Sequence, residues 1–90
     1  METNANPGGW TSFRPLTSED KDVFNKALNG LVGVGYEPLL VATQVVAGIN
    51  YRFFCNAKVV YPNAPYYAAI ILIFKPLQGD AHITSIQRVD

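Results

Sequence analysis

The run Gln44-Val45-Val46-Ala47-Gly48-Ile49-Asn50-Tyr51 lies between two segments that are rich in β-branched and aromatic residues. That composition favours strands on both sides of the run, so the run itself is expected to contain a hairpin turn. Glycine at position 48 suits such a turn, because it adopts backbone conformations that a Cβ atom disfavours. Two valines are poorly suited to a turn that only faces water. We therefore expect Val45 and Val46 to be presented to a partner at the hairpin tip.

Strands extend from this hairpin in both directions. The pattern predicts strands over residues 36–46, 48–60, 66–75 and 82–89. The breaks between the later strands, at residues 62–65 and 76–80, are rich in turn-forming residues. Short connections require antiparallel neighbours, because a parallel pair needs a long crossover. Residues 36–90 are thus expected to form a β-meander.

Alternation along residues 49–59 assigns their side chains to the two faces of the sheet. One face is apolar and is expected to lie against a helix: Ile49, Tyr51, Phe53, Cys55, Ala57 and Val59. The opposite face carries Asn50, Arg52, Phe54, Asn56 and Lys58. Cys55 is therefore expected to point into the core.

A helix is predicted before the strands, over residues 17–32. Thr17 or Ser18 can cap it, and the acidic residues that follow lie in the first turns, where the helix dipole favours negative charge. Apolar residues at helical spacing form one stripe: Val23, Phe24, Ala27, Leu28 and Leu31. Either Asn29-Gly30 or Gly33 is expected to end the helix.

Residues 1–16 are polar and are interrupted by proline and glycine. We expect them to form a flexible arm, with a short strand at residues 10–13. One helix followed by an antiparallel meander is an α+β arrangement in which the helix lies across one face of the sheet. The chain has 90 residues, which allows a single domain (residues 1–90) with one core.

Charge and composition exclude several classes of function. The formal net charge is zero, so nucleic acid is not an expected partner. Three tyrosines near the second turn could stack on bases, but cross-strand packing is the favoured interpretation: Tyr61, Tyr66 and Tyr67. The longest apolar run, at residues 66–74, is too short to span a bilayer, and residues 1–6 do not resemble a signal peptide. We therefore expect no membrane partner. One cysteine allows no internal disulfide, so we expect a cytoplasmic protein.

The residues offer little for catalysis. Cys55 and His82 are the one thiol and the one imidazole, and they could form a nucleophilic pair. A small buried core cysteine is the more common role for such a residue. The carboxylates at positions 19, 20 and 22 are more simply explained by the helix dipole, and no spacing suggests a metal site. We expect no enzyme and no cofactor.

The hairpin run also carries a family resemblance. Its Gln-x-Val-x-Gly pattern between two strands is similar to that of the cystatins, and Gln44–Gly48 followed by x-Asn-Tyr resembles the stefin (type 1) branch. Pro7-Gly8-Gly9 resembles the glycine-bearing stefin arm, and Phe74-Lys75-Pro76-Leu77 resembles the end of the fourth stefin strand and the second hairpin loop. Residues 84–90 look like the last strand. The likeness spans nearly the whole chain in the same order.

This resemblance implies a five-stranded antiparallel sheet around one helix, with the first strand supplied by the arm. It also implies a reversible, tight-binding inhibitor of papain-like cysteine proteases that fills the active-site cleft without a covalent step. The arm and two loops would form a wedge along one edge. The implied protease-binding residues are Pro7, Gly8, Gly9, Gln44, Val45, Val46, Ala47, Gly48, Pro76, Leu77 and Gln78. Gly9 and Gly48 would allow close approach of the backbone.

Two further expectations concern self-association. The resemblance implies that Ala69, Ile71 and Ile73 face the helix. A second apolar set would then face outward, where stefins usually carry more polar residues: Phe54, Ala68, Ile70 and Leu72. A second copy or another partner would cover this face. Val46 matches a position that the family holds in unfavourable backbone geometry, and relief of that strain would give a domain-swapped dimer. The rival interpretation is a non-inhibitory binding or assembly module that uses the apolar outer face.

Overall fold

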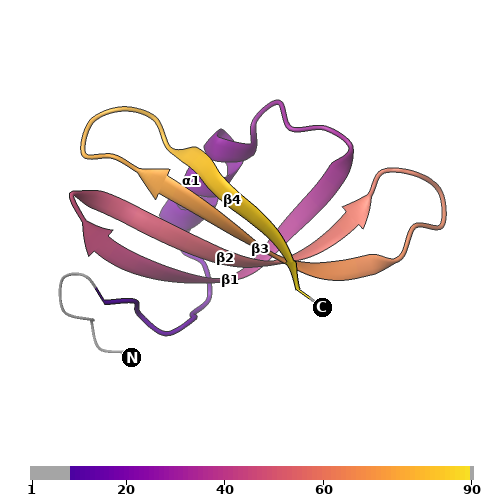
Figure 1. Cartoon of the computed structure of the whole chain (residues 1–90), viewed down its shortest axis with the longest axis horizontal. Coiled ribbons are helices and arrows are strands. Elements are labelled where there is room, and N and C mark those ends of the chain that lie inside the picture. Colours follow the sequence, from indigo (N-terminus) through magenta and orange to yellow (C-terminus); the bar gives the residue numbers. More distant parts are fainter. Residues whose placement is uncertain (1–8, 90) are drawn as a thin grey trace.

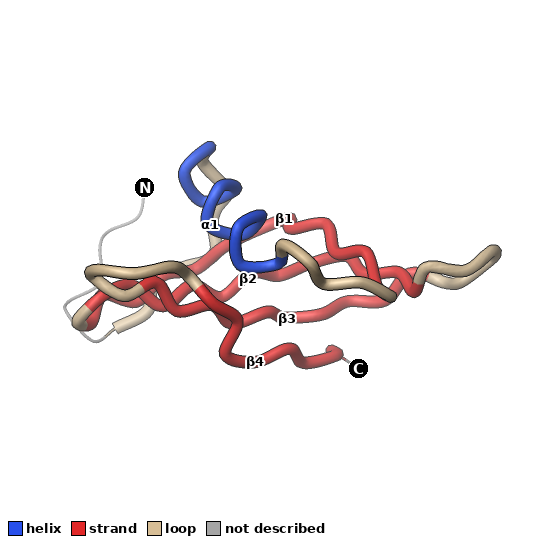
Figure 2. Tube along the Cα trace, turned by 90° about the horizontal axis from the view of Figure 1, so that it is seen from above, coloured by secondary structure: helices blue, strands red, loops and turns tan. Residues whose placement is uncertain are grey.

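The computed structural model describes residues 9–89, which fold into one helix followed by an antiparallel sheet. The helix is α1 (Ser18–Leu28), and the strands are β1 (Val34–Val46), β2 (Gly48–Val59), β3 (Tyr66–Lys75) and β4 (His82–Val89). The strand order is β1-β2-β3-β4, so each strand pairs with the next along the chain. Figures 1 and 2 show α1 across one face of this sheet. The expected α+β class and the antiparallel order are confirmed, and every strand bound agrees with its predicted value to within two residues.

The core lies between α1 and the face of the sheet that the helix covers. Val23 and Phe24 of α1 are buried, and the Phe24 ring meets the Phe53 ring edge-on with centroids 4.9 Å apart. Sheet residues complete the core with side chains from the first three strands: Val41, Tyr51, Phe53, Cys55, Ala57, Ala69, Ile71 and Ile73. The alternation predicted for β2 is thus confirmed, as is the inward row that the resemblance implied for β3, and Cys55 points into the core as expected.

The opposite face of the sheet is also rich in apolar residues. Phe54 pairs with Ile70, Arg52 with Leu72, and Asn56 with Ala68, so the expected outward set is contiguous across β2 and β3. We call Phe54, Ala68, Ile70 and Leu72 the outer apolar patch. Each of these four residues is half-buried. The predicted outward orientation is confirmed.

The helix is shorter than predicted, because it ends at Leu28 rather than at residue 32. Asn29 has φ −58° and ψ 127°, which is not helical, and Gly30 has φ 89°, in the left-handed region that glycine tolerates. Asn29-Gly30 is therefore the stop signal, not Gly33. Leu31 falls outside the helix and is 43% exposed, so its assignment to the apolar stripe was wrong.

The arm follows the free edge of β1 instead of forming the continuous fifth strand that the resemblance implied. Trp10 bridges Gln44 and Arg14 bridges Val41, and these are isolated bridges. Between the two bridges the arm advances four positions while β1 advances three. The extra residue breaks the ladder in the manner of a β-bulge.

Hydrogen bonds hold the arm along this edge. The Thr11 amide donates to the Thr43 carbonyl at 2.9 Å, and the Thr43 amide donates to the Thr11 hydroxyl at 3.0 Å. Arg14 and Val41 exchange two backbone hydrogen bonds of 2.9 Å. Residues 10–14 are therefore paired with the edge of β1, where a short strand was expected at residues 10–13, while residues 1–8 lie outside the described range.

The start of α1 is built around one buried carboxylate. Thr17 and Asp20 form a capping box in which the Asp20 amide donates to the Thr17 hydroxyl and the Thr17 amide donates to the Asp20 carboxylate. The Arg14 guanidinium donates to the same carboxylate at 2.6 Å. Burial alone would raise the pKa of Asp20, but the hydrogen bonds from Arg14 and Thr17 outweigh it and lower the pKa below its ordinary value of 3.8.

Replacing Asp20 with alanine should lower the free energy of unfolding by about 1–3 kcal/mol at neutral pH, since hydrogen bonds to a charged group are lost. A carboxyl whose folded pKa is depressed stabilises the fold above its unfolded pKa, and the contribution disappears as pH falls through the folded pKa. The deficit should therefore be largest above about pH 4 and vanish in strong acid. Urea denaturation across this range measures it.

Asp22→Ala is the matched control, because Asp22 is an exposed carboxylate on the same helix. It should change the free energy of unfolding by less than about 0.5 kcal/mol. Equal effects of the two substitutions, or an Asp20→Ala deficit that persists in strong acid, would contradict the role given to Asp20.

Candidate functional site

The β1–β2 hairpin ends in a very tight turn. β1 finishes at Val46 and β2 starts at Gly48, two residues that pair with each other and leave Ala47 alone at the tip. The side chains of Val45 and Val46 are 57% and 40% exposed. Below them, the side-chain amide nitrogen of Asn50 donates a hydrogen bond of 2.8 Å to the side-chain oxygen of Gln44, which links the two strands at the base of the turn. The expected hairpin with exposed valines is confirmed.

The loop between β3 and β4 lies beside this hairpin. Ile49 pairs with Lys75, so the residues that follow Lys75 leave the sheet next to the β1–β2 turn. Leu77 is 78% exposed, and Gln78 next to it is exposed as well. Figure 1 shows both turns at the same end of the sheet, on the left. Two apolar tips therefore project side by side.

The arm reaches the same end. The bridge between Trp10 and Gln44 places Gly9 beside the base of the hairpin. Pro7 and Gly8 lie outside the described residues. We call the surface formed by Gly9, residues 44–48 and residues 76–78 the loop end. It gathers every predicted contact residue that the structure describes.

Gly48 has a role inside the molecule that the sequence did not predict. It is buried with φ 121°, and an added Cβ atom would lie 2.5 Å from the Lys75 carbonyl oxygen and 2.9 Å from the Phe74 ring. The close approach that glycine allows here is between β2 and β3 of the same chain. Gly48 therefore sets how near the two turns can lie, in addition to any contact with a partner.

The backbone at Val46 does not show left-handed strain. Among residues 9–89, Asn63 is the one non-glycine residue with positive φ. The left-handed backbone angle of this turn belongs to Gly48, which has φ 121°, and a domain swap driven by strain at Val46 stays a prediction.

The Cys55–His82 pair is not assembled. Cys55 is fully buried, its sulfur lies 3.7 Å from the Phe53 carbonyl oxygen, and burial raises the pKa of its thiol to about 12. His82 is exposed, and its ring packs edge-on against Phe74 with centroids 5.9 Å apart. Cys55 pairs with Ala69 whereas His82 pairs with Phe74, so the two residues are separated along the sheet. Over residues 9–89, no group of His, Cys, Asp and Glu side chains could hold a metal ion.

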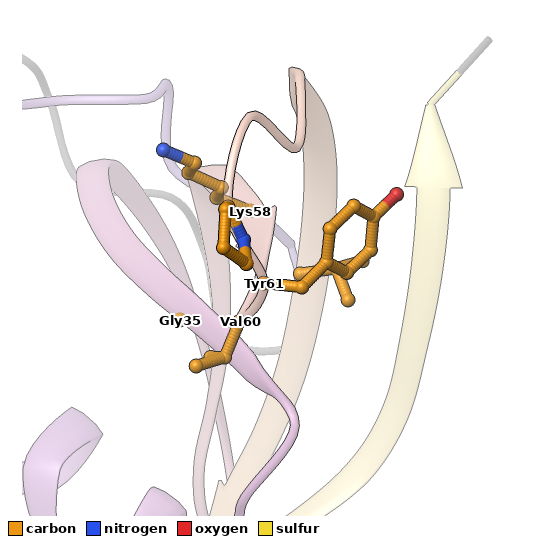
Figure 3. Close-up of a pocket in the computed structure, with 6 residues that line it drawn as sticks. Gly35, Lys58, Val60 and Tyr61 are labelled. Carbon is orange, nitrogen blue, oxygen red and sulfur yellow. The ribbon is translucent and has the colours of Figure 1, made fainter.

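A pocket lies at the opposite end of the sheet from the loop end. It has a volume of about 500 Å³, and Figure 3 shows its lining residues Gly35, Lys58, Val60 and Tyr61, which come from β1, β2 and the turn after β2. No predicted contact residue lines it. Two of the nearby tyrosines pack against cations on neighbouring strands: the Lys58 ammonium lies 5.1 Å from the centroid of the Tyr66 ring, and the Arg88 guanidinium carbon lies 4.4 Å from that of the Tyr67 ring.

Comparison with known proteins adds no relative. No protein-family model matches this chain, and no curated protein matches it. Within the described residues, no helix has the length and apolar character needed to cross a membrane. The geometry of the loop end is therefore the main basis for a functional argument. Sequence reasoning found its two turns but missed Trp10, although this residue directly follows Gly9 and is the one tryptophan in the chain.

Replacing Gly48 with alanine should lower the free energy of unfolding by about 1–3 kcal/mol, since the added methyl group collides with backbone and the residue keeps a positive φ. Backbone amide shifts of Phe74 and Lys75 should move with it. Gly35→Ala is the matched control in the same sheet, because its Cβ atom would lie at an ordinary 3.9 Å from the nearest atom, the Lys58 carbonyl oxygen. Equal stability of the two variants, measured by urea denaturation, would contradict the close approach.

Proposed function

We propose that this protein is a cystatin-like, reversible, tight-binding inhibitor of papain-like cysteine proteases. It fills the active-site cleft with the arm, the hairpin tip and the second loop, and forms no covalent bond. One observation carries the proposal: Gly9, residues 45–47 and Leu77 lie together at one end of the sheet, and the two turns expose apolar side chains there. The resemblance of residues 44–51 to the stefin hairpin supports the same function.

The shape of the loop end suits entry into a cleft. A turn with one residue at its tip is narrow, and the adjoining loop presents a second apolar side chain beside it. Burial of these side chains contributes about 25 cal/mol for each Å² of apolar surface removed from water, before ordering costs. Because the turns are fixed by strand pairing and by the packing at Gly48, little order remains to be gained on binding.

The cytoplasm is the compartment proposed for this function. The thiol of Cys55 is free and buried, and the core forms around it without a covalent cross-link. Such a core is compatible with a reducing environment.

Titration of papain with the purified protein tests the proposal. Stoichiometric, reversible inhibition is expected. Val46→Asp and Leu77→Asp should each weaken binding about 10- to 1,000-fold, because a carboxylate placed in an apolar contact loses its hydration. Both side chains are exposed in the free protein, so these variants should still fold.

Val60→Asp is the matched control for this titration. Val60 is 71% exposed at the other end of the sheet, so the same chemical change there should leave inhibition unaltered. Absence of inhibition by the unmodified protein at micromolar concentration would refute the proposal. Equal losses for Val46→Asp and Val60→Asp would show that the loop end is not the contact surface.

A second candidate function is a non-inhibitory module that assembles through the outer apolar patch. The patch is contiguous across β2 and β3, and exposed Phe13 and Leu40 extend it toward the arm and β1. The arm partly covers it, since the Phe13 ring packs edge-on against Phe54 with centroids 6.5 Å apart. A second copy of the chain is the occupant proposed for the remainder.

Sedimentation velocity from micromolar to millimolar protein tests this candidate. If two copies join through the outer apolar patch, a dimer should form in this range, and Ile70→Lys should weaken it at least about 10-fold by placing a charge in the interface. Val60→Lys provides the control at an exposed valine outside the patch. A monomer throughout the range would exclude the homodimer.

A further inference from the structure

Arg52 and Trp10 form a contact that neither the fold nor the wedge accounts for. The guanidinium carbon of Arg52, on the outer face of β2, lies 4.0 Å from the centroid of the Trp10 ring. A cation over an aromatic face at this distance is attracted by the negative face of the ring. Among residues 9–89, Arg52 has no ion-pair partner. Its positive charge is thus directed at the arm.

The position of Trp10 gives this contact a consequence. Trp10 bridges Gln44 through the backbone, and Gln44 is the residue before the exposed valines of the hairpin. Gly9, the first residue of the loop end, directly precedes Trp10. The Trp10 ring therefore lies where the arm meets the base of the hairpin.

The rest of the arm is anchored independently of Arg52. Arg14 binds Asp20 of α1 and pairs with Val41 of β1, while Phe13 packs against Phe54. These contacts keep the arm on the sheet edge if the Arg52 contact is lost. The contribution of Arg52 is then confined to Trp10 and Gly9, where the arm reaches the loop end.

We propose that Arg52 is a positioning residue that holds the arm in its binding-competent place by fixing the Trp10 ring. Preassembly of a binding segment reduces the entropy lost when a complex forms, and its effect is mainly on the rate of dissociation. For its effect on a protease, this inference rests on the proposed function. The placement of the arm itself can be tested without any protease.

Tryptophan fluorescence provides that test, because Trp10 is the sole tryptophan. Arg52→Gln removes the cation and keeps a polar stem. It should make the ring more accessible to acrylamide and lower its steady-state anisotropy, whereas Arg52→Lys, which keeps a cation, should restore part of both. Lys58→Gln is the matched control, because it removes a cation–ring contact from the same strand and the same face, far from the arm. It should leave Trp10 emission unchanged.

Papain dissociation rates test the consequence for binding. Arg52→Gln should speed dissociation roughly 3- to 30-fold, the range expected for one cation–π contact, with little change in association. In a Trp10→Ala background, Arg52→Gln should have no further effect, because the residue acts through the ring. Arg52→Lys should recover part of the slow dissociation, and Lys58→Gln should match the unmodified protein.

The outcomes separate the two proposals. Unchanged Trp10 accessibility and anisotropy in Arg52→Gln would overturn the positioning role, whatever papain does. A full effect of Arg52→Gln on dissociation in the Trp10→Ala background would also overturn it, since Arg52 would then contact the protease directly. Loss of ring shielding in Arg52→Gln together with no inhibition by the unmodified protein would retain the positioning role and refute the inhibitor function alone.

Discussion

The carboxylate of Asp20 is the point at which arm, helix and sheet edge meet. The Asp20 side chain is 6% exposed, and its carboxylate accepts hydrogen bonds from the Arg14 guanidinium and from the backbone amide and hydroxyl of Thr17. Arg14 in turn exchanges two backbone hydrogen bonds with Val41 of β1. A buried charge is tolerated only where such partners surround it. The need of this buried carboxylate for hydrogen-bond partners therefore ties together the first turn of α1, the arm at Arg14 and the edge of β1.

A second constraint acts at the loop end. The two turns stand on a shared base, in which Gly48 lies against the Lys75 carbonyl and the Phe74 ring, and Phe74 packs against His82. Pairing of β2 with β3 holds this base together, and the packing of the Phe74 and His82 rings links it to β4. The exposed tips add nothing to the base. The end of the molecule therefore combines a rigid support with side chains that are free to contact another surface.

The sequence predicted what depends on local pattern. Alternation identified the buried face of β2, the resemblance identified that of β3, and the glycine in the hairpin marked the turn. It did not decide which of two local stop signals ends the helix, and it did not reveal the contacts between distant residues. The helix stripe included Leu31 because periodicity does not register the stop at Asn29-Gly30. The course of the arm depends on a one-residue bulge against β1, and the Trp10–Arg52 contact joins residues 42 positions apart, so neither follows from spacing. At the candidate site, the pattern marked the exposed tips. It did not show that a Cβ atom at position 48 would collide with the Lys75 carbonyl oxygen, which is why glycine is needed there.

This separation of support and tip affects how the protein can diverge. The exposed tip residues carry little of the fold, while the residues beneath them, Gly48 included, carry most of the local packing. Substitutions at Val45, Val46, Ala47, Leu77 and Gln78 can accumulate under selection for new targets without eroding stability. In the proposed inhibitor, the exposed tips of the loop end could therefore vary while the residues beneath them stay fixed. The same property makes the chain a compact scaffold for grafted peptides or randomised libraries, and its fold needs no disulfide.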